Sequence, residues 1–200
     1  MTIFMTKGER TKQHIIEKAM PVFSQQGLAG TSMADLVAAT GLQKGGIYGH
    51  FKSKDALALA AFDYAFARAT NILTRALETQ QRALDRLSAV VDAFLTMTQD
   101  ATFVGGCHLL NTAVDSDDTH PALRQKVQVG LEQWQNMICN EVSQGIAQGE
   151  LQPRCSANDI AIITIAMLEG GMMLTKAHGQ RHYLERVAEH LKTTFKEMAQ

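Results

Sequence analysis

The 200-residue chain has little cysteine, little proline and no long apolar run. Its three cysteines, Cys107, Cys139 and Cys155, are too scattered for a disulfide framework or a metal-binding pair. The longest apolar stretch, residues 160–168, is much shorter than the roughly 20 residues that span a bilayer. The first residues also lack the apolar core of a signal peptide. We therefore expect a soluble, cytoplasmic protein with no membrane contact.

Motifs for common enzyme and cofactor sites are also absent. We find no P-loop, dinucleotide-binding, nucleophile-elbow, His-Glu-x-x-His or kinase signature. His178 and His182 have the spacing of two ligands on one helix face, but Gly179 between them indicates a turn. We expect no enzyme activity, no cofactor and no metal. A small all-α enzyme and an interaction module remain as alternative interpretations.

The residues that are abundant favour helices. Hydrophobic residues make up 46% of the chain and charged residues 20%, and no long run alternates with period two. The pattern predicts an all-α protein. Gly27 is expected to end the first helix, and Pro21 to bend or break it. The predicted helices cover about residues 9–26, 32–41, 43–50, 54–78, 82–100, 106–115, 121–149, 156–178 and the segment after 179.

Charge is distributed unevenly along the chain. Residues 1–60 carry seven Lys or Arg against four Asp or Glu, a net charge of +3. The remaining residues carry twelve against sixteen, a net charge of −4. A basic first third attached to an acidic remainder indicates that the N-terminal part is the one that meets a polyanion.

Residues 36–50 have the spacing of a helix-turn-helix. Leu36 and Val37 would bury one helix, Gly41 would make the turn, and Leu42 and Ile47 would anchor the second helix. Such a helix presents hydrogen-bond donors and glycines outward, which suits the major groove of DNA. A helical hairpin inside an all-α enzyme would show the same spacing. The outward residues would be Gln43, Lys44, Gly45, Gly46, Tyr48, Gly49 and His50.

Residues 27–54 resemble the DNA-binding signature of the tetracycline-repressor (TetR) family of bacterial regulators. The most recognisable portion is Lys44-Gly45-x-x-Tyr48-x-His50-Phe51-x-Ser53-Lys54. The resemblance implies a dimer of nine-helix subunits, in which residues 1–53 bind DNA and residues 54–200 bind an effector and dimerise. It places phosphate contacts at Lys44, Tyr48, His50, Lys54 and Thr31, and base contacts at Gln43 and the backbone of residues 45–46. The full set of implied DNA-binding residues is Thr31, Ser32, Gln43, Lys44, Gly45, Gly46, Tyr48, Gly49, His50 and Lys54.

The implied function is that of a ligand-responsive transcriptional regulator, in particular a repressor that a small molecule releases from a palindromic operator. We expect the effector pocket in the helices after residue 54, lined by Cys107, His108, Asn111, Trp134, Met137 and Met167. Thr112 and Asp115 share a polar helix stripe with His108 and Asn111, which either lines the effector site or faces solvent. Cys107 follows two glycines and precedes a histidine, so it is either a buried packing residue or a sensor of electrophiles or oxidants.

A dimer interface is expected on the last two helices. Residues 160–174 are apolar on nearly every side, which does not suit a helix on the surface of a monomer. The Gly170–Gly171 pair would let two helices approach closely, and an apolar stripe on the last helix would complete a four-helix contact. The residues assigned to this interface are Ile165, Met172, Leu184, Leu191 and Phe195.

Overall fold

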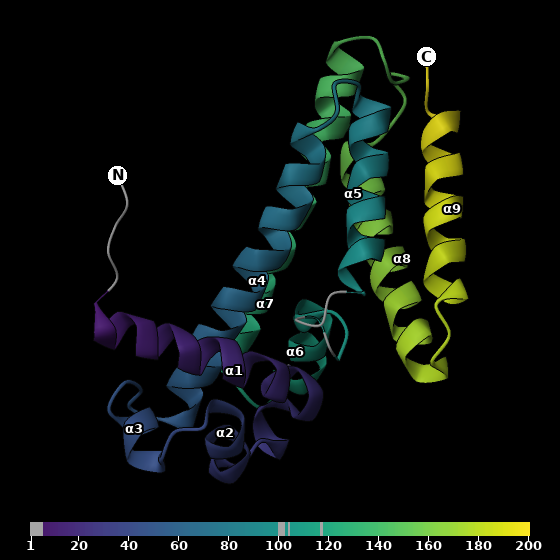
Figure 1. Ribbon diagram of the computed structural model, residues 1–200. Coiled ribbons are helices and arrows are strands. Elements are labelled where there is room, and N and C mark those ends of the chain that lie inside the picture. The colour runs from purple at the N-terminus through teal and green to yellow at the C-terminus, as the bar shows by residue number, and fades with distance from the viewer. Residues whose placement is uncertain (1–5, 100–102, 104, 117) are drawn as a thin grey trace.

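The computed structural model describes residues 6–99, 103, 105–116 and 118–200, and this part of the chain is helical (Figure 1). The β-type pairing in the described residues is one isolated antiparallel bridge, between Leu151 and Ala199. The all-α prediction is confirmed. The helices are α1 (Lys7–Gly30), α2 (Met33–Thr40), α3 (Lys44–Tyr48), α4 (Lys54–Glu78), α5 (Ala83–Met97), α6 (His108–Ser116), α7 (Pro121–Ala147), α8 (Ala157–His178) and α9 (His182–Glu197).

Local sequence signals explain most helix ends. Ser32 caps α2 and exchanges hydrogen bonds with Asp35, which lower the pKa of that carboxyl group. Gly41 and Gly179 adopt left-handed conformations after α2 and α8. Within α1 the break in helical backbone lies at Gly27 (φ 70°) and not at Pro21, through which the helix continues. The predicted end of the fifth helix at residue 100 lies outside the described residues.

The first three helices pack around a small core of their own. This core consists of Ile15, Ala19, Leu36, Ile47, Phe51 and Leu57. Leu57 belongs to α4, so the long helix that leaves the N-terminal part also contributes to its core. In Figure 1 the three helices lie across the lower end of α4 and α7. A shift of α4 would therefore move the N-terminal helices directly.

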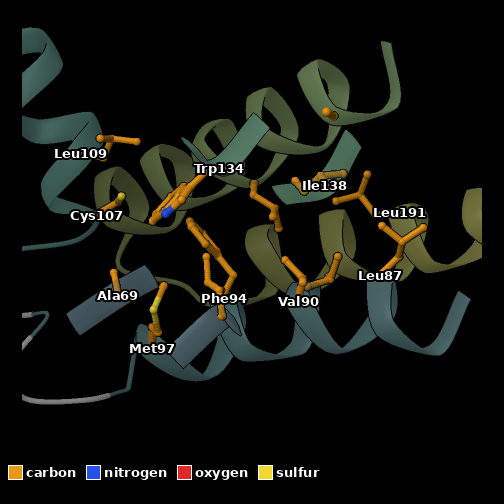
Figure 2. Close-up of a cluster of buried hydrophobic side chains, with 14 of the residues drawn as sticks. Ala69, Leu87, Val90, Phe94, Met97, Cys107, Leu109, Trp134, Ile138 and Leu191 are labelled. Atoms are coloured by element: carbon orange, nitrogen blue, oxygen red, sulfur yellow. The ribbon is translucent and has the colours of Figure 1, made fainter. Parts of the chain in front are cut away.

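The remaining helices share a larger core centred on Trp134 of α7. Its ring stacks on Phe66 at 5.7 Å and meets the edge of Phe94 at 6.3 Å between centroids. Its indole nitrogen donates a 2.8 Å hydrogen bond to Thr70 Oγ1 on α4. Figure 2 shows the Trp134 ring beside Cys107 and over Phe94. Burial of these aromatic rings joins α4, α5, α6 and α7 into one body.

Among the described helices, α8 alone has the length and the apolar composition that a membrane-spanning helix would need. Its inner face packs against α7 and α9, and Gly171 lies so close to Leu184 that a Cβ atom there would be 3.0 Å away. Its outer face is apolar and exposed. An exposed apolar helix face of this kind is typical of a surface that another molecule covers.

Candidate nucleic-acid interface and effector cavity

One side of α3 packs against the rest of the subunit, and the other side faces solvent. Ile47 is buried against α1, α2 and the start of α4, and Gly41 makes the turn that leads into α3. The predicted outward residues from Gln43 to Gly49 are indeed exposed, and His50 is half-buried. Gln43 precedes the helix without using its side chain as a cap. Its amide is therefore available for a contact outside the protein.

The glycines of α3 leave open space where side chains would lie. A Cβ atom at Gly45 would meet nothing within 4 Å, and one at Gly46 would meet only Leu42 at an ordinary 3.6 Å. Packing within the subunit thus does not require glycine at these positions, although each glycine costs the helix about 1 kcal/mol relative to alanine. Glycine there lets the helix backbone approach a large partner closely.

The basic groups on this face are free to bind phosphate. The ammonium group of Lys44 lies 5.8 Å from the centre of the Tyr48 ring, and both side chains are exposed. Ser32, at the start of α2, is also exposed. Its hydroxyl donates a 2.6 Å hydrogen bond to Asp35 Oδ2, so the Lys44 ammonium and the Tyr48 phenol are the side-chain groups here that suit the DNA backbone.

Two of the predicted phosphate contacts, Thr31 and Lys54, make hydrogen bonds within the subunit. The side chain of Thr31 is only 1% exposed, and its hydroxyl donates a 2.7 Å hydrogen bond to the carbonyl of Gly27. Lys54 donates hydrogen bonds from Nζ to the carbonyls of Leu28 (2.7 Å) and Thr31 (2.8 Å). These carbonyls lie where α1 ends, so Lys54 caps that end of the helix. Burial of Thr31 excludes the predicted phosphate contact of its side chain in this conformation, whereas the phosphate contact of Lys54 stays a prediction.

We expect Lys54→Ala to destabilise the fold by about 1–2 kcal/mol, because hydrogen bonds from a charged donor to two carbonyls are lost. Urea denaturation at fixed protein concentration measures this change. Lys52→Ala, which removes an exposed charge two residues away, serves as the control and should leave stability unchanged. If Lys54→Ala leaves stability unchanged and lowers only the salt dependence of DNA binding, Lys54 is a phosphate contact after all.

The polar stripe on α6 contacts α1. Asp115 Oδ2 accepts a 2.7 Å hydrogen bond from the backbone amide of Leu28, beside the break at Gly27. Asn111 Nδ2 donates to the carbonyls of Ser24 (3.1 Å) and Gly105 (2.7 Å). The polar residues of this stripe thus do not simply face solvent, and lining a ligand site is not their only role. It fixes the end of the first DNA-binding helix to the C-terminal helices.

A cavity of about 790 Å³ lies beside these hydrogen bonds, between α1, α4, α6 and α8. This volume falls within the range of about 300–1,000 Å³ that small-molecule sites occupy. Most of its wall is apolar, with polar groups from His108, Asn111, Asp115 and Lys176. A ligand in this cavity would contact the hydrogen bonds that join α6 to α1.

The predicted effector residues are divided between this cavity and two small voids. His108 and Asn111 line the large cavity. Cys107, His108 and Trp134 line a void of about 20 Å³, while Trp134 and Met137 line one of about 10 Å³. Met167 packs against the core and lines none of the three. The α1 and α4 walls of the cavity were not predicted, because Phe23 and Phe62 show only the helical spacing of core residues.

Cys107 is a buried thiol. Burial, followed by the neighbouring Glu169 carboxyl group, raises its pKa well above the ordinary value. Electrophiles and oxidants react with the thiolate, which is disfavoured here. Of the two interpretations of Cys107, the geometry supports a packing residue.

Four of the five residues assigned to the dimer interface are corrected, because they are buried within their own subunit. Leu184, Leu191 and Phe195 point into the subunit core, and Met172 is buried as well. Ile165 is half-buried and lines one of the small voids. The apolar stripe of α9 is therefore already covered by α5 and α8 of its own subunit. Periodicity identified an apolar face but not which neighbour covers it.

The exposed apolar face of α8 is a separate stripe. Its residues recur at helical spacing and cover about a third of the helix circumference. The two isoleucines are 48% and 53% exposed and Met173 is 55% exposed. Gly170, in the middle of the stripe, has nothing within 4 Å of an added Cβ atom. We call this surface the α8 stripe; it consists of Ile162, Ile163, Ala166, Gly170, Met173, Leu174 and Ala177.

Comparisons with known proteins agree with this geometry. Residues 15–61 match the family model of bacterial regulatory proteins of the tetR family, and residues 83–191 match a tetracyclin repressor-like C-terminal domain. A TetR transcriptional regulator from Chloroflexus aurantiacus J-10-FL is 39% identical over 98% of both chains, with a TM-score of 0.93. A TetR-family regulator from Cytophaga hutchinsonii is 36% identical over 98% of both chains, with a TM-score of 0.88. The transcriptional repressor DhaR from Mycobacterium sp. strain GP1 is 25% identical over 88% of this chain and 87% of its own length.

Proposed function

Because the chain belongs to the TetR family of bacterial regulators, we propose that it is a repressor that a small molecule releases from a two-fold symmetric operator. Family membership makes it a DNA-binding transcriptional regulator and not an enzyme. The observation that carries the proposal is the cavity of about 790 Å³ at the junction between α1 of the DNA-binding part and α6.

The DNA contact is proposed to lie on α3. Gln43 would read a base edge from the N-terminal end of the helix, and Lys44 and Tyr48 would bind the flanking phosphates. The exposure of these side chains and the open space at Gly45 support this arrangement. His50, Ser32, Gly46 and Gly49 lie on the rim of the same surface. Residues 1–53 would form the DNA-binding domain, and residues 54–200 the effector-binding and dimerisation domain.

A second copy of this chain is proposed to cover the α8 stripe. In Figure 1, α8 and α9 lie on the side of the molecule away from α3. Two-fold pairing along α8 would bury the exposed isoleucines and Met173, and Gly170 would allow the two helices to approach closely. Two copies of α3 would then face two successive half-sites of the operator.

We propose that a ligand bound in the cavity releases the DNA by changing the position of α1. A ligand that fills the space between α6 and α1 would displace Asn111 and Asp115, whose hydrogen bonds hold the end of α1. The DNA-binding helices would then rotate relative to the dimer face, and the spacing of the two α3 helices would change. A coupling of about 1–3 kcal/mol between the two sites is sufficient for regulation.

We expect Asp115→Ala to weaken the response to ligand, because the hydrogen bond to the Leu28 amide that the ligand would disturb in the wild type is already absent. A compound that releases the wild type from DNA should have little effect on the variant. The ratio of operator affinity without compound to operator affinity with compound should be about 5–150-fold smaller in the variant than in the wild type. Amide exchange at Leu28 should also be faster. Thr112→Ala, on the same helix and the same cavity wall, is the control. An undiminished response in Asp115→Ala would show that release follows another route.

The proposed function is tested by selecting binding sites from random double-stranded DNA with the purified protein. A library of small molecules is then screened for release of the selected DNA. An enriched inverted repeat that at least one compound releases supports the proposal. If a repeat is enriched but no compound releases it, the protein binds an operator without responding to a ligand. If no sequence is enriched, operator recognition is overturned.

A further inference from the structure

A buried acid lies in α8, the long helix whose outer face is apolar. Glu169 is only 8% exposed, and neither of its carboxylate oxygens has a hydrogen-bond partner. The adjacent Cys107 thiol, a weak donor, lowers the pKa of Glu169 by less than burial raises it. Burial dominates and raises that pKa to about 7. An unpaired buried carboxyl group costs stability, which favours a partner that is absent from the subunit itself.

Aromatic rings surround the space beside this acid. Glu169 shares one small void with Phe94 and Trp134, and Trp134 separates it from the second void, which Phe66 and Phe103 also line. Ring faces carry negative potential and attract cations. The titratable side chains lining the two voids, from α4 to α8 and the segment before α6, are Glu169, Cys107 and His108. Burial keeps the Cys107 thiol protonated, and it lowers the pKa of His108 to about 4, so His108 is neutral.

The voids connect to the large cavity through two side chains. His108 and Met172 line both the cavity of about 790 Å³ and the void beside Cys107. Each void has room for about one water molecule, so a larger group requires a side chain to move. Met172 lies three residues after Glu169 on α8 and has a flexible, unbranched side chain. Rotation of Met172 would open the path from the large cavity to the void beside Cys107, whose thiol interacts with the Glu169 carboxyl group.

We propose that Glu169, with the aromatic side chains around Trp134, binds the ammonium group of an apolar amine whose body occupies the large cavity. The N–H groups of the amine would donate to the carboxylate oxygens that lack partners. The ring faces of Trp134 and Phe94 would surround the charge. This proposal rests on the ligand-responsive function proposed above and assigns the chemical class of the ligand.

Binding at this site is coupled to a proton. Below pH 7 the buried carboxyl group is mostly protonated, whereas an alkylammonium ion carries its charge throughout the neutral range. When the ammonium ion enters, the carboxyl proton leaves to solvent and the carboxylate pairs with the cation. Up to one proton is therefore released per site, and affinity rises as the pH is raised towards 7 and levels off above it.

The experiment compares three probes of similar shape: 2-phenylethylamine, which is cationic, 2-phenylethanol, which is neutral and forms hydrogen bonds, and propylbenzene, which is apolar. Because Trp134 is the single tryptophan of the chain, its fluorescence reports binding at the site directly. Calorimetry below pH 7, in buffers of different ionisation enthalpy, counts released protons. DNA is left out, so that binding is measured independently of operator recognition.

We expect the amine to bind at least about tenfold more tightly than either neutral probe and to release a proton. Glu169→Gln should abolish both the preference and the proton release, while Glu132→Gln, an exposed acid on α7, should change neither. Equal binding of all three probes, no binding of the amine, or amine binding without proton release by the wild type would overturn the proposal. All three results are measured on the wild type, so they hold even if Glu169→Gln does not fold.

A separate titration with selected operator DNA distinguishes this proposal from the proposed function. If amines do not bind but another compound releases the operator, the ligand class is wrong and ligand-responsive repression stands. If amines bind as described and no compound releases the operator, the site is correct and the regulatory role fails.

Discussion

Replacing Ile163 with glutamate is expected to produce a monomer that binds operator DNA roughly 10²–10⁴-fold more weakly than the wild type. Ile163 is 53% exposed in the α8 stripe, and in a dimer it would be buried against the second copy. A buried carboxylate without a partner opposes association. A monomer would have one α3 helix to place on DNA and would lose the gain from binding two half-sites together. Analytical ultracentrifugation and operator titration measure the two effects.

The matched control is Val129→Glu on α7. Val129 is 55% exposed, but it lines a shallow groove facing α4 and lies away from the α8 stripe. This variant should remain dimeric and bind DNA normally. Because both positions are exposed in the subunit, both variants should fold, which circular dichroism would verify. A dimeric Ile163→Glu with unchanged operator affinity would contradict the assignment of the α8 stripe.

Gln43→Ala and Lys44→Ala are expected to weaken operator binding in different ways. Gln43→Ala should cost about 1–3 kcal/mol per half-site and relax the preference at one base pair, because an amide that pairs with a base edge is lost. Lys44→Ala should weaken binding to all sequences. It should lower the slope of log K against log salt by about 2 in the dimer, one phosphate contact per subunit. Titrations over a range of salt, on the selected operator and on single-base variants, separate the two effects.

Lys52→Ala provides the comparison for Lys44→Ala, because it also removes an exposed positive charge from the N-terminal part but lies outside α3. Its effect on the salt slope should be smaller. If Gln43→Ala changed only the salt slope and Lys44→Ala changed sequence preference, the two roles would be reversed. In that case Lys44 would read a guanine edge, and α3 would lie differently in the groove.

Patterns within single helices could be predicted from the sequence. The capping pair Ser32–Asp35, the turn at Gly41 and the buried anchor Ile47 depend on neighbours a few residues away, and all three have the expected structure. The exposure of Gln43 and Lys44 follows from the same local geometry. The helix-turn-helix was therefore predictable from residues 31–54 alone.

Contacts between distant helices could not be predicted in this way. The Lys54 ammonium group binds carbonyls 23 and 26 residues earlier, and Asp115 binds an amide 87 residues earlier. Periodicity shows that α9 has an apolar stripe, but not that α5 and α8 of the same subunit cover it. Glu169 is visible in the sequence as an acid within a long apolar helix. The apolar character of residues 160–174 was predicted, whereas the burial of this one acid was not.

The central claim, that a dimer places two α3 helices in the major groove of one operator, is tested most directly by methylation protection at guanine N7. This atom lies in the major groove, so a bound α3 should shield it. We predict protection at two clusters whose centres are about 10–10.5 base pairs, or a multiple of that distance, apart, with both clusters weakened in Gln43→Ala. Protection at a single cluster, or no change at N7 when the selected DNA is fully bound, would contradict the account.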